Sequence, residues 1–438
     1  MAHPGELTAH RGAVLHFRSD PGEHDAADSY EYWPDGVLLV RHGTIESVGD
    51  WTRISAALPS SGYELIDHDG ALLLPGFVDT HIHYPQTDVI ASGGRNLLDW
   101  LEHYTFPVEA GFGNPAHARS VAEFFLDELL ANGTTTAQVL GTVHGASADA
   151  FFEAAERRSL RMIAGKVLMD RHCPEDLRDT AADGESETRA IIERWHEHER
   201  LLYAITPRFA PTSTEAQLAS AGRIAADYPT VFVHSHLAEN HDEIAWVRKL
   251  FPDCDSYTEV YDRFGLLRER ATYAHCLHLD AHDRKRMAVS GATAAFCPTS
   301  NLYLGSGLFD IAATDAAGLK FALATDVGGG TSFSMLRTMG EAYKVAQLRG
   351  QRLSPLRAFY LATLGGARAL GLSDRIGSFC PGNEADFIAL DLQATPLLAR
   401  RAAQCKSLSE TLLLAMILGD DRCIAATYIL GQRVTRSA

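Results

Sequence analysis

Histidine and acidic residues that could bind a metal ion lie at several separate places in the sequence. His81 and His83 stand two residues apart in "PGFVDTHIH", and His234 and His236 form a second such pair in "VFVHSHLAEN". Asp326 follows the apolar run "LKFALA". Three neutral imidazoles and one carboxylate suit Zn²⁺ or Fe²⁺ and leave room for a water molecule. The pattern predicts a site for one divalent ion.

The spacing within each histidine pair is that of neighbours on one face of a strand. Side chains two residues apart on a strand point the same way, with Cα atoms about 6.6 Å apart, so His81 and His83 can face one ion. Of His234 and His236, only one need be a ligand. A single strand histidine is usually satisfied by ordinary hydrogen bonds. Here, however, polar residues end four different predicted strands: the two histidine pairs, His275 and an aspartate. This combination indicates a metal site instead.

Two carboxylates could move protons beside such an ion. Glu239 comes three residues after His236, in the loop that follows the predicted strand. It is either a solvated loop residue or a base that takes a proton from water and delivers it to a substrate nitrogen. Asp326 could be a ligand, a proton acceptor or both, and the glycines after it allow close approach of the backbone to a ligand.

Eight short apolar segments between residues 76 and 375 are expected to be strands that position these residues. They are 76–83, 134–141, 161–170, 203–209, 230–240, 271–276, 291–298 and 319–326. Amphipathic helical stretches separate most of them; that of residues 116–133 ends on a helix-stopping Gly133. This alternation predicts a closed parallel (β/α)8 barrel, in which all carboxyl strand ends meet at one mouth. A doubly wound open sheet is the alternative.

Both chain ends read as short strands with Gly and Asp at the turns. We expect residues 1–75 and 376–438 to combine into one small β-sandwich beside the catalytic barrel of residues 76–375.

The composition limits the partners. The chain has 438 residues and a formal net charge of −17, which disfavours nucleic acid. No apolar run is long enough for a membrane span, and the first residues do not resemble a secretion signal. Seven cysteines without a CxxC pair fit reduced thiols in a cytoplasmic protein.

The motifs "PGFVDTHIH", "HSHLAEN", "AHC" and "TDVGGG" together resemble the mononuclear deaminase branch of the amidohydrolase superfamily. Within this branch the chain most resembles the guanine deaminase family. That likeness rests on "HIHYPQ", "TPRF" and "CPTSNLYLGSG", and on "LLDWLEHYTFP", which resembles the loop that covers the pocket in that family. The resemblance covers nearly the whole chain, including the split β-sandwich.

The resemblance implies a role for each site residue. It makes His81, His83, His236 and Asp326 the ligands of one divalent ion, with zinc preferred and Fe²⁺ as the alternative. It makes Glu239 the general acid/base, lets His275 orient the attacking hydroxide, and gives Asp326 a catalytic role. It assigns substrate contacts to His83, Gln86, Arg208, Phe209, His236, Glu239 and Asp326. The implied reaction converts guanine to xanthine and ammonia, and the implied assembly is a homodimer.

Three other functions remain open from the sequence. The first is deamination of another aminated heterocycle, such as another purine, a pterin, cytosine or a triazine. The second is a binuclear cyclic-amide hydrolase in which a carboxylated Lys166 bridges two metal ions, although the H-x-x-E motif favours a structural role for this lysine. The third is a catalytically silent scaffold, which would be expected to lack some of the ligands.

Overall fold

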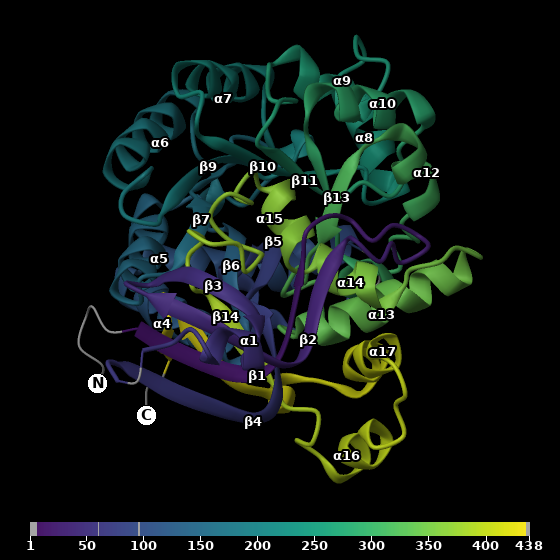
Figure 1. The fold of residues 1–438 in the computed structure, drawn as a ribbon. Helices are drawn as coiled ribbons and strands as arrows, with labels where there is room; N and C mark the ends of the chain where they lie inside the picture. Colours follow the sequence, from purple (N-terminus) through teal and green to yellow (C-terminus); the bar gives the residue numbers. More distant parts are fainter. Residues whose placement is uncertain (1–6, 60, 95–96, 435–438) are drawn as a thin grey trace.

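The computed structural model describes residues 7–59, 61–94 and 97–434. Its central part is a nearly closed barrel of parallel strands surrounded by helices (Figure 1). In hydrogen-bonding order the strands are β5 (Phe77–His83), β6 (Thr134–Leu140), β7 (Arg161–Gly165), β9 (Leu202–Pro207), β10 (Phe232–Leu237), β11 (Ala271–His275), β12 (Thr293–Phe296) and β13 (Lys320–Leu323). The predicted (β/α)8 barrel is confirmed, and the open doubly wound sheet was the wrong alternative.

Backbone hydrogen bonds join the first barrel strand to the chain that follows the last one. The N–H of Asp326 donates to the carbonyl of His81 at 3.0 Å, and the N–H of His83 donates to the carbonyl of Val327 at 2.9 Å. Every residue of β5 and β6 is buried. Such strands are covered on both faces, which explains why they read as nearly continuous apolar runs.

Two predicted strands differ from the structure. The segment 161–170 is broken at Lys166, whose N–H donates to the Tyr203 hydroxyl at 3.1 Å instead of to a strand partner. It continues as β8 (Val167–Leu168), which pairs with β9. The last strand ends at Leu323, so Asp326 lies in the following loop, where its φ of 52° departs from strand geometry.

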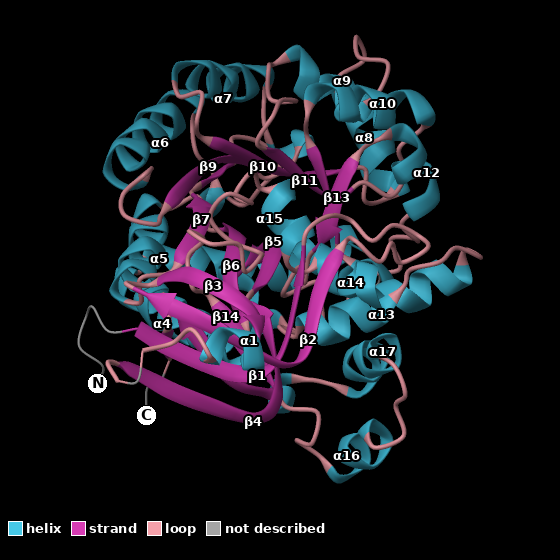
Figure 2. Ribbon diagram, viewed as in Figure 1, coloured by secondary structure: helices cyan, strands magenta, loops and turns pink. Residues whose placement is uncertain are grey.

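Most of the helices that accompany the barrel strands lie outside them, whereas the helix that ends at Ala369 lies within the ring of strands, next to β5 and β13 (Figure 2). These helices are α4 (Pro115–Ala131), α5 (Gly145–Arg157), α6 (Ala181–Trp195), α7 (Glu215–Asp227), α8 (His241–Leu250), α9 (Tyr257–Arg263), α10 (Ala281–Ser290), α11 (Pro298–Tyr303), α12 (Ile311–Ala317), α13 (Met335–Leu348), α14 (Pro355–Leu361) and α15 (Leu364–Ala369). Asn114 caps α4 by accepting the N–H of Ala116 at 3.0 Å, and Gly133 follows its end with φ of 78°. None of the helices in the described ranges has both the length and the hydrophobicity needed to span a lipid bilayer.

The strands of the two chain ends join in one sheet, as the sequence predicts. Its order is β16 (Gln432–Arg433), β15 (Ile424–Ile429), β14 (Phe387–Leu390), β4 (Tyr63–Pro75), β1 (Leu7–Phe17), β2 (Tyr30–Arg41) and β3 (Thr44–Asp50), followed in the chain by α1 (Trp51–Ser55). Where the sequence predicts a small sandwich, the described residues form one hydrogen-bonded sheet, with register shifts in β1 near Gly12. The outermost residues of the predicted terminal domain, 1–6 and 435–438, lie outside the described residues, and its boundaries stay a prediction.

Two helices within the C-terminal part were not expected from the sequence. They are α16 (Pro396–Ala402) and α17 (Leu408–Leu418); α17 lies beside α13 and α14, and α16 packs against α17 (Figure 1). Gly340 lets the backbones of α13 and α17 approach closely, because a Cβ atom at this position would lie 2.5 Å from the carbonyl oxygen of Met416 in α17.

A buried ionic cluster connects the barrel to the terminal sheet. Glu384, which precedes β14, accepts hydrogen bonds at 2.6 Å from Nε of Arg161 and from a terminal nitrogen of Arg200. Arg200 also pairs with the buried Asp386. Both guanidinium groups are more than nine-tenths buried. The carboxylates therefore have to offset the free-energy cost of burying these two positive charges.

We expect Glu384→Ala to destabilise the protein, because it leaves two buried guanidinium groups undercompensated. The cost of removing one partner from such a pair is about 3–5 kcal/mol. Thermal unfolding followed by circular dichroism should show a lower Tm. Glu46→Ala, which removes the exposed partner of Arg41, is the control and should leave the Tm unchanged. Equal melting temperatures for Glu384→Ala and the wild type would contradict this role.

Candidate active site

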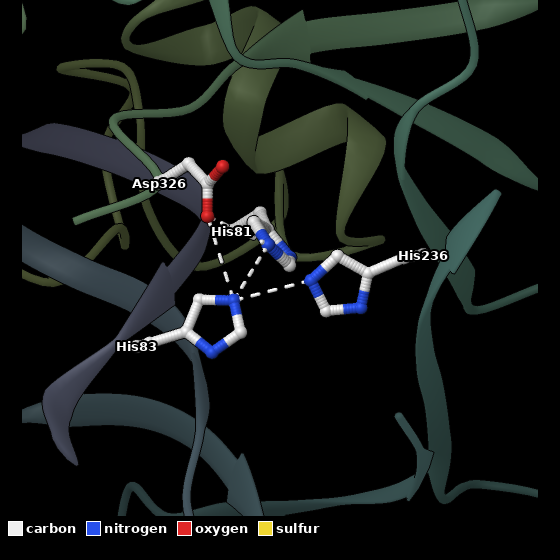
Figure 3. A group of neighbouring side chains, drawn as sticks. All are labelled: His81, His83, His236 and Asp326. Carbon is white, nitrogen blue, oxygen red and sulfur yellow. Dashed lines mark hydrogen bonds and ion pairs between the residues drawn. The ribbon is translucent and has the colours of Figure 1, made fainter. Parts of the chain in front are cut away.

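Four side chains from three parts of the barrel converge at its mouth (Figure 3). His81 and His83 come from β5, His236 from β10, and Asp326 from the loop after β13. One potential ligand atom of each lies within 4.8 Å of those of the others. Nε2 of His83 is 3.1 Å from Nε2 of His81 and 3.2 Å from Nε2 of His236. Oδ1 of Asp326 lies 3.2 Å from Nε2 of His81 and 3.4 Å from Nε2 of His83.

This cluster has the charge and the lone pairs that a cation requires. Burial, with repulsion from neighbouring positive groups, lowers the pKa of His81, His83 and His236 well below 6.5, so the three imidazoles are neutral at pH 7. When the facing nitrogen of each ring carries no proton, the imidazole nitrogens and the carboxylate oxygen at these distances repel through their lone pairs. A divalent ion among them would remove the repulsion, and three imidazoles with one carboxylate are a familiar donor set for such ions.

Surrounding groups orient two of the imidazoles. Nδ1 of His81 lies 2.7 Å from Nε2 of His234, and Nδ1 of His236 donates to the carbonyl oxygen of Arg208 at 2.6 Å. A proton on Nδ1 leaves the lone pair of Nε2 directed at the cluster, as in metal sites whose ligands are held by a second layer of hydrogen bonds. His234, which the sequence left as an alternative ligand, therefore lies behind His81.

Buried Asp79 ties the two ends of the barrel sheet together at this cluster. Its Oδ1 accepts the N–H of His81 at 3.2 Å and the N–H of Thr325 at 3.1 Å. The Thr325 hydroxyl donates to its second oxygen. One carboxylate thus fixes the backbone at His81 and the backbone next to Asp326, and with them two of the four candidate ligands.

Glu239 lies beside the cluster, two residues after β10 ends. Its Oε2 is 3.2 Å from Nε2 of His275, and its Oε1 accepts a hydrogen bond from the Ser306 hydroxyl at 2.8 Å. Burial raises the pKa of Glu239 above its usual 4.5, although His275 and Ser306 oppose this. Ala238, with φ of 52°, turns the chain sharply before Glu239.

His275 is held between acidic groups and an amide. Its Nδ1 donates to Oδ1 of Asn301 at 2.8 Å, and its Nε2 lies 3.7 Å from Oδ2 of Asp326. Burial disfavours the charged ring, but Glu239 and Asp326 outweigh it and raise the pKa of His275 above 6.5. Burial also raises the pKa of Asp326. The ring is thus suited to hold a proton between two carboxyl groups.

A pocket extends from this cluster to an apolar wall. The predicted substrate residues Gln86, Arg208 and Phe209 all line it, as do His83, His236, Glu239, His275 and Asp326. Leu97, Trp100 and Leu101 close one side and pack with Phe209. They belong to a cover of three short helices: α2 (Leu97–Trp100), η2 (Leu101–Thr105) and α3 (Phe106–Ala110). The walls are suited to a flat ring with polar atoms on its edge.

Two buried glutamates in this region were missed from the sequence. Glu109 of the cover pairs with Arg208, with Oε2 2.6 Å from the guanidinium, and accepts a hydrogen bond from Gln86 at 3.0 Å. Glu243 accepts the N–H groups of Glu239 and Asn240 at 2.9 and 3.1 Å, and burial raises its pKa to about 7. The N-x-x-E spacing of a capping box could have revealed Glu243, whereas no local motif marks Glu109.

Lys166 pairs with two carboxylates, neither of which belongs to the four-residue cluster. Its ammonium is 2.5 Å from Oδ2 of Asp179 and 3.1 Å from Oε2 of Glu187. Neither carboxylate would tolerate the negative charge that carboxylation adds to a lysine. The geometry therefore agrees with the structural role favoured for Lys166 and disfavours the binuclear alternative.

Comparisons with known proteins agree with this arrangement. Residues 72–434 match the model of the amidohydrolase family. A guanine deaminase of Escherichia coli K12 is 48% identical over 98% of this chain and 98% of that protein. A solved structure of E. coli guanine deaminase superposes with a TM-score of 0.96 over 98% of this chain and 100% of that one, at 48% identity. A guanine deaminase of C. acetobutylicum with bound guanine in its active site superposes with a TM-score of 0.87 over the same shares, at 29% identity.

Proposed function

The chain belongs to the amidohydrolase family, and we propose that it catalyses the hydrolytic deamination of guanine to xanthine and ammonia. Its similarity to the guanine deaminases spans the barrel and the terminal sheet, and makes it a hydrolase of C–N bonds. The observation that carries the proposal is the position of the buried Glu239 next to a cluster of three imidazoles and a carboxylate, within one pocket that Arg208 also lines.

We propose that His81, His83, His236 and Asp326 hold one divalent ion. Zinc is the preferred ion, and Fe²⁺ is the alternative. The supports are the neutral imidazoles, the convergent lone pairs and the donor set. When bound, such an ion would lower the pKa of water toward about 7 and so supply a nucleophile at neutral pH.

Glu239 moves the proton that links nucleophile and substrate. It takes a proton from the attacking water and delivers it to N3 of the purine, which makes C2 electrophilic. Its raised pKa suits a group that must both accept and release a proton near neutral pH. The Ser306 hydroxyl holds one of its oxygens, so the other faces His275 and the reacting centre.

His275 and Asp326 complete the reaction. The His275 ring, fixed by Asn301, orients the nucleophile and stabilises the negative charge that develops on the oxygen added to C2. Asp326 accepts the remaining hydroxyl proton and assists its transfer to the departing amine. Water thus adds to C2, the C2–N bond breaks, and ammonia leaves.

The pocket walls suit the purine. Phe209 offers a flat apolar face, and Arg208 donates hydrogen bonds to the oxygen at C6. Gln86 also lines the pocket. In this proposal Gln86 faces the edge of the purine, while His83 and His236 face the reacting carbon.

We propose further that the protein works as a homodimer in the cytoplasm. The seven cysteines are free, as in a reducing compartment. Leu397 of α16 and Ile417 of α17 are 59% and 44% exposed, and we propose that a second copy covers these apolar side chains.

The central assignment is tested by Glu239→Gln. This nearly isosteric change removes the proton carrier but leaves the four proposed ligands intact. The variant should fold and keep its metal, as measured by elemental analysis, yet lose about 10²–10⁴-fold in kcat for guanine. Near-normal turnover would show that another group carries the proton.

The Ser306 hydroxyl should affect the pH dependence of kcat/KM. Its hydrogen bond to the carboxylate lowers the pKa of Glu239, so Ser306→Ala should raise that pKa. Because Glu239 must be ionised to accept a proton, the acid limb of the pH profile of kcat/KM should move to higher pH. Ser220→Ala, which removes a hydroxyl bonded to Glu185 outside the pocket, is the control and should leave the limb in place. An unmoved or lowered limb in Ser306→Ala would contradict the role of Glu239.

A further inference from the structure

The carboxylate of Glu109 joins the two polar residues predicted to face the purine edge. Its Oε2 accepts a hydrogen bond from a terminal nitrogen of Arg208 at 2.6 Å. Its Oε1 accepts one from the Gln86 amide at 3.0 Å. Glu109 is fully buried, and the Arg208 side chain is 3% exposed. Both oxygens of the carboxylate are therefore used by residues that line the pocket.

The cover segment holds Arg208 in two ways. Glu109 accepts a hydrogen bond from one edge of the Arg208 guanidinium. The ring centre of Phe106, from the same helix α3, lies 5.3 Å from the central carbon of that guanidinium. A guanidinium is planar and presents its five N–H donors in a fixed fork. Fixing one edge and one face of Arg208 therefore leaves its remaining donors in a set direction.

We infer that Glu109 is a positioning residue that aims Arg208 at the oxygen on C6 of the purine. The inference rests on the proposed function, in which Arg208 donates to that oxygen. Glu109 thus contributes to the preference for purines that carry an oxo group at C6 over purines that lack it.

The Gln86 contact extends this network toward the proposed metal. The Gln86 amide nitrogen lies 3.0 Å from Nδ1 of His83, and its oxygen accepts the N–H of Gly328 at 3.2 Å. Glu109 therefore couples the residue that recognises the purine edge to the surroundings of a candidate ligand. The cover contributes a charge to recognition besides its apolar wall.

The test uses Glu109→Gln and two competitive inhibitors of guanine turnover. Hypoxanthine carries the C6 oxygen, and unsubstituted purine lacks it. In the variant, the amide has only one acceptor oxygen, whereas the carboxylate accepted hydrogen bonds from both Arg208 and Gln86. Arg208 therefore loses its fixed direction. The inhibition constant of hypoxanthine should rise by about tenfold, as expected when a charge-assisted hydrogen bond is lost, while that of purine should change little. The KM for guanine should rise more than kcat falls.

Glu102→Gln is the matched control, because Glu102 lies on the same cover but is exposed. It should leave both inhibition constants unchanged. A double-mutant cycle with Arg208→Ala gives a second measure. If Glu109 acts through Arg208, adding Glu109→Gln to Arg208→Ala should lower hypoxanthine binding no further. This double variant also avoids a buried carboxylate without its partner, so it guards against failure of a single variant to fold.

The outcomes separate the inference from the function on which it rests. A wild-type protein that does not deaminate guanine would refute the proposed function. A wild type that does so, with equal losses of hypoxanthine and purine binding in Glu109→Gln, would overturn the role of Glu109 alone. So would additive effects of the two substitutions on hypoxanthine binding.

Discussion

The structure depends on the burial of four electron-pair donors against one another. His81, His83, His236 and Asp326 bring their ligand atoms within 4.8 Å, and burial keeps the three imidazoles neutral. With the facing nitrogens unprotonated, this arrangement is repulsive without a cation, and a cation would turn it into a source of binding energy. The same ion would give the neighbouring Glu239 a water molecule acidic enough to deprotonate. The proposed metal binding and the proposed catalysis would thus both follow from one electrostatic constraint.

The closed barrel allows residues so distant in sequence to meet that constraint. Parallel strands direct all their carboxyl ends to one mouth, and hydrogen bonds from Asp326 and His83 close the ring between the first strand and the last. Asp79 accepts N–H groups from both sides of this junction. The terminal sheet is attached to the barrel by the buried cluster around Glu384. The cover over the mouth then adds the residues that contact Arg208.

Local patterns predicted most of the barrel and much of the site. Apolar runs indicated the strands, and histidines at their ends indicated the cluster, because both signals lie within a few residues. Contacts made across the fold left weaker signals. Lys166 breaks the third strand through a hydrogen bond to Tyr203, and Glu109 meets Arg208 across 99 positions. Neither contact has a local pattern. The capping box at Glu243 was legible, but its contact with the Glu239 backbone depends on tertiary structure.

Anomalous X-ray scattering at the zinc edge, from crystals supplied with zinc, tests the central claim most directly. If the four side chains bind one ion, a single strong peak should lie about 2.0–2.2 Å from Nε2 of His81, His83 and His236 and from an oxygen of Asp326. A crystal with these side chains ordered and no peak among them, or with the ion bound elsewhere, would contradict this claim.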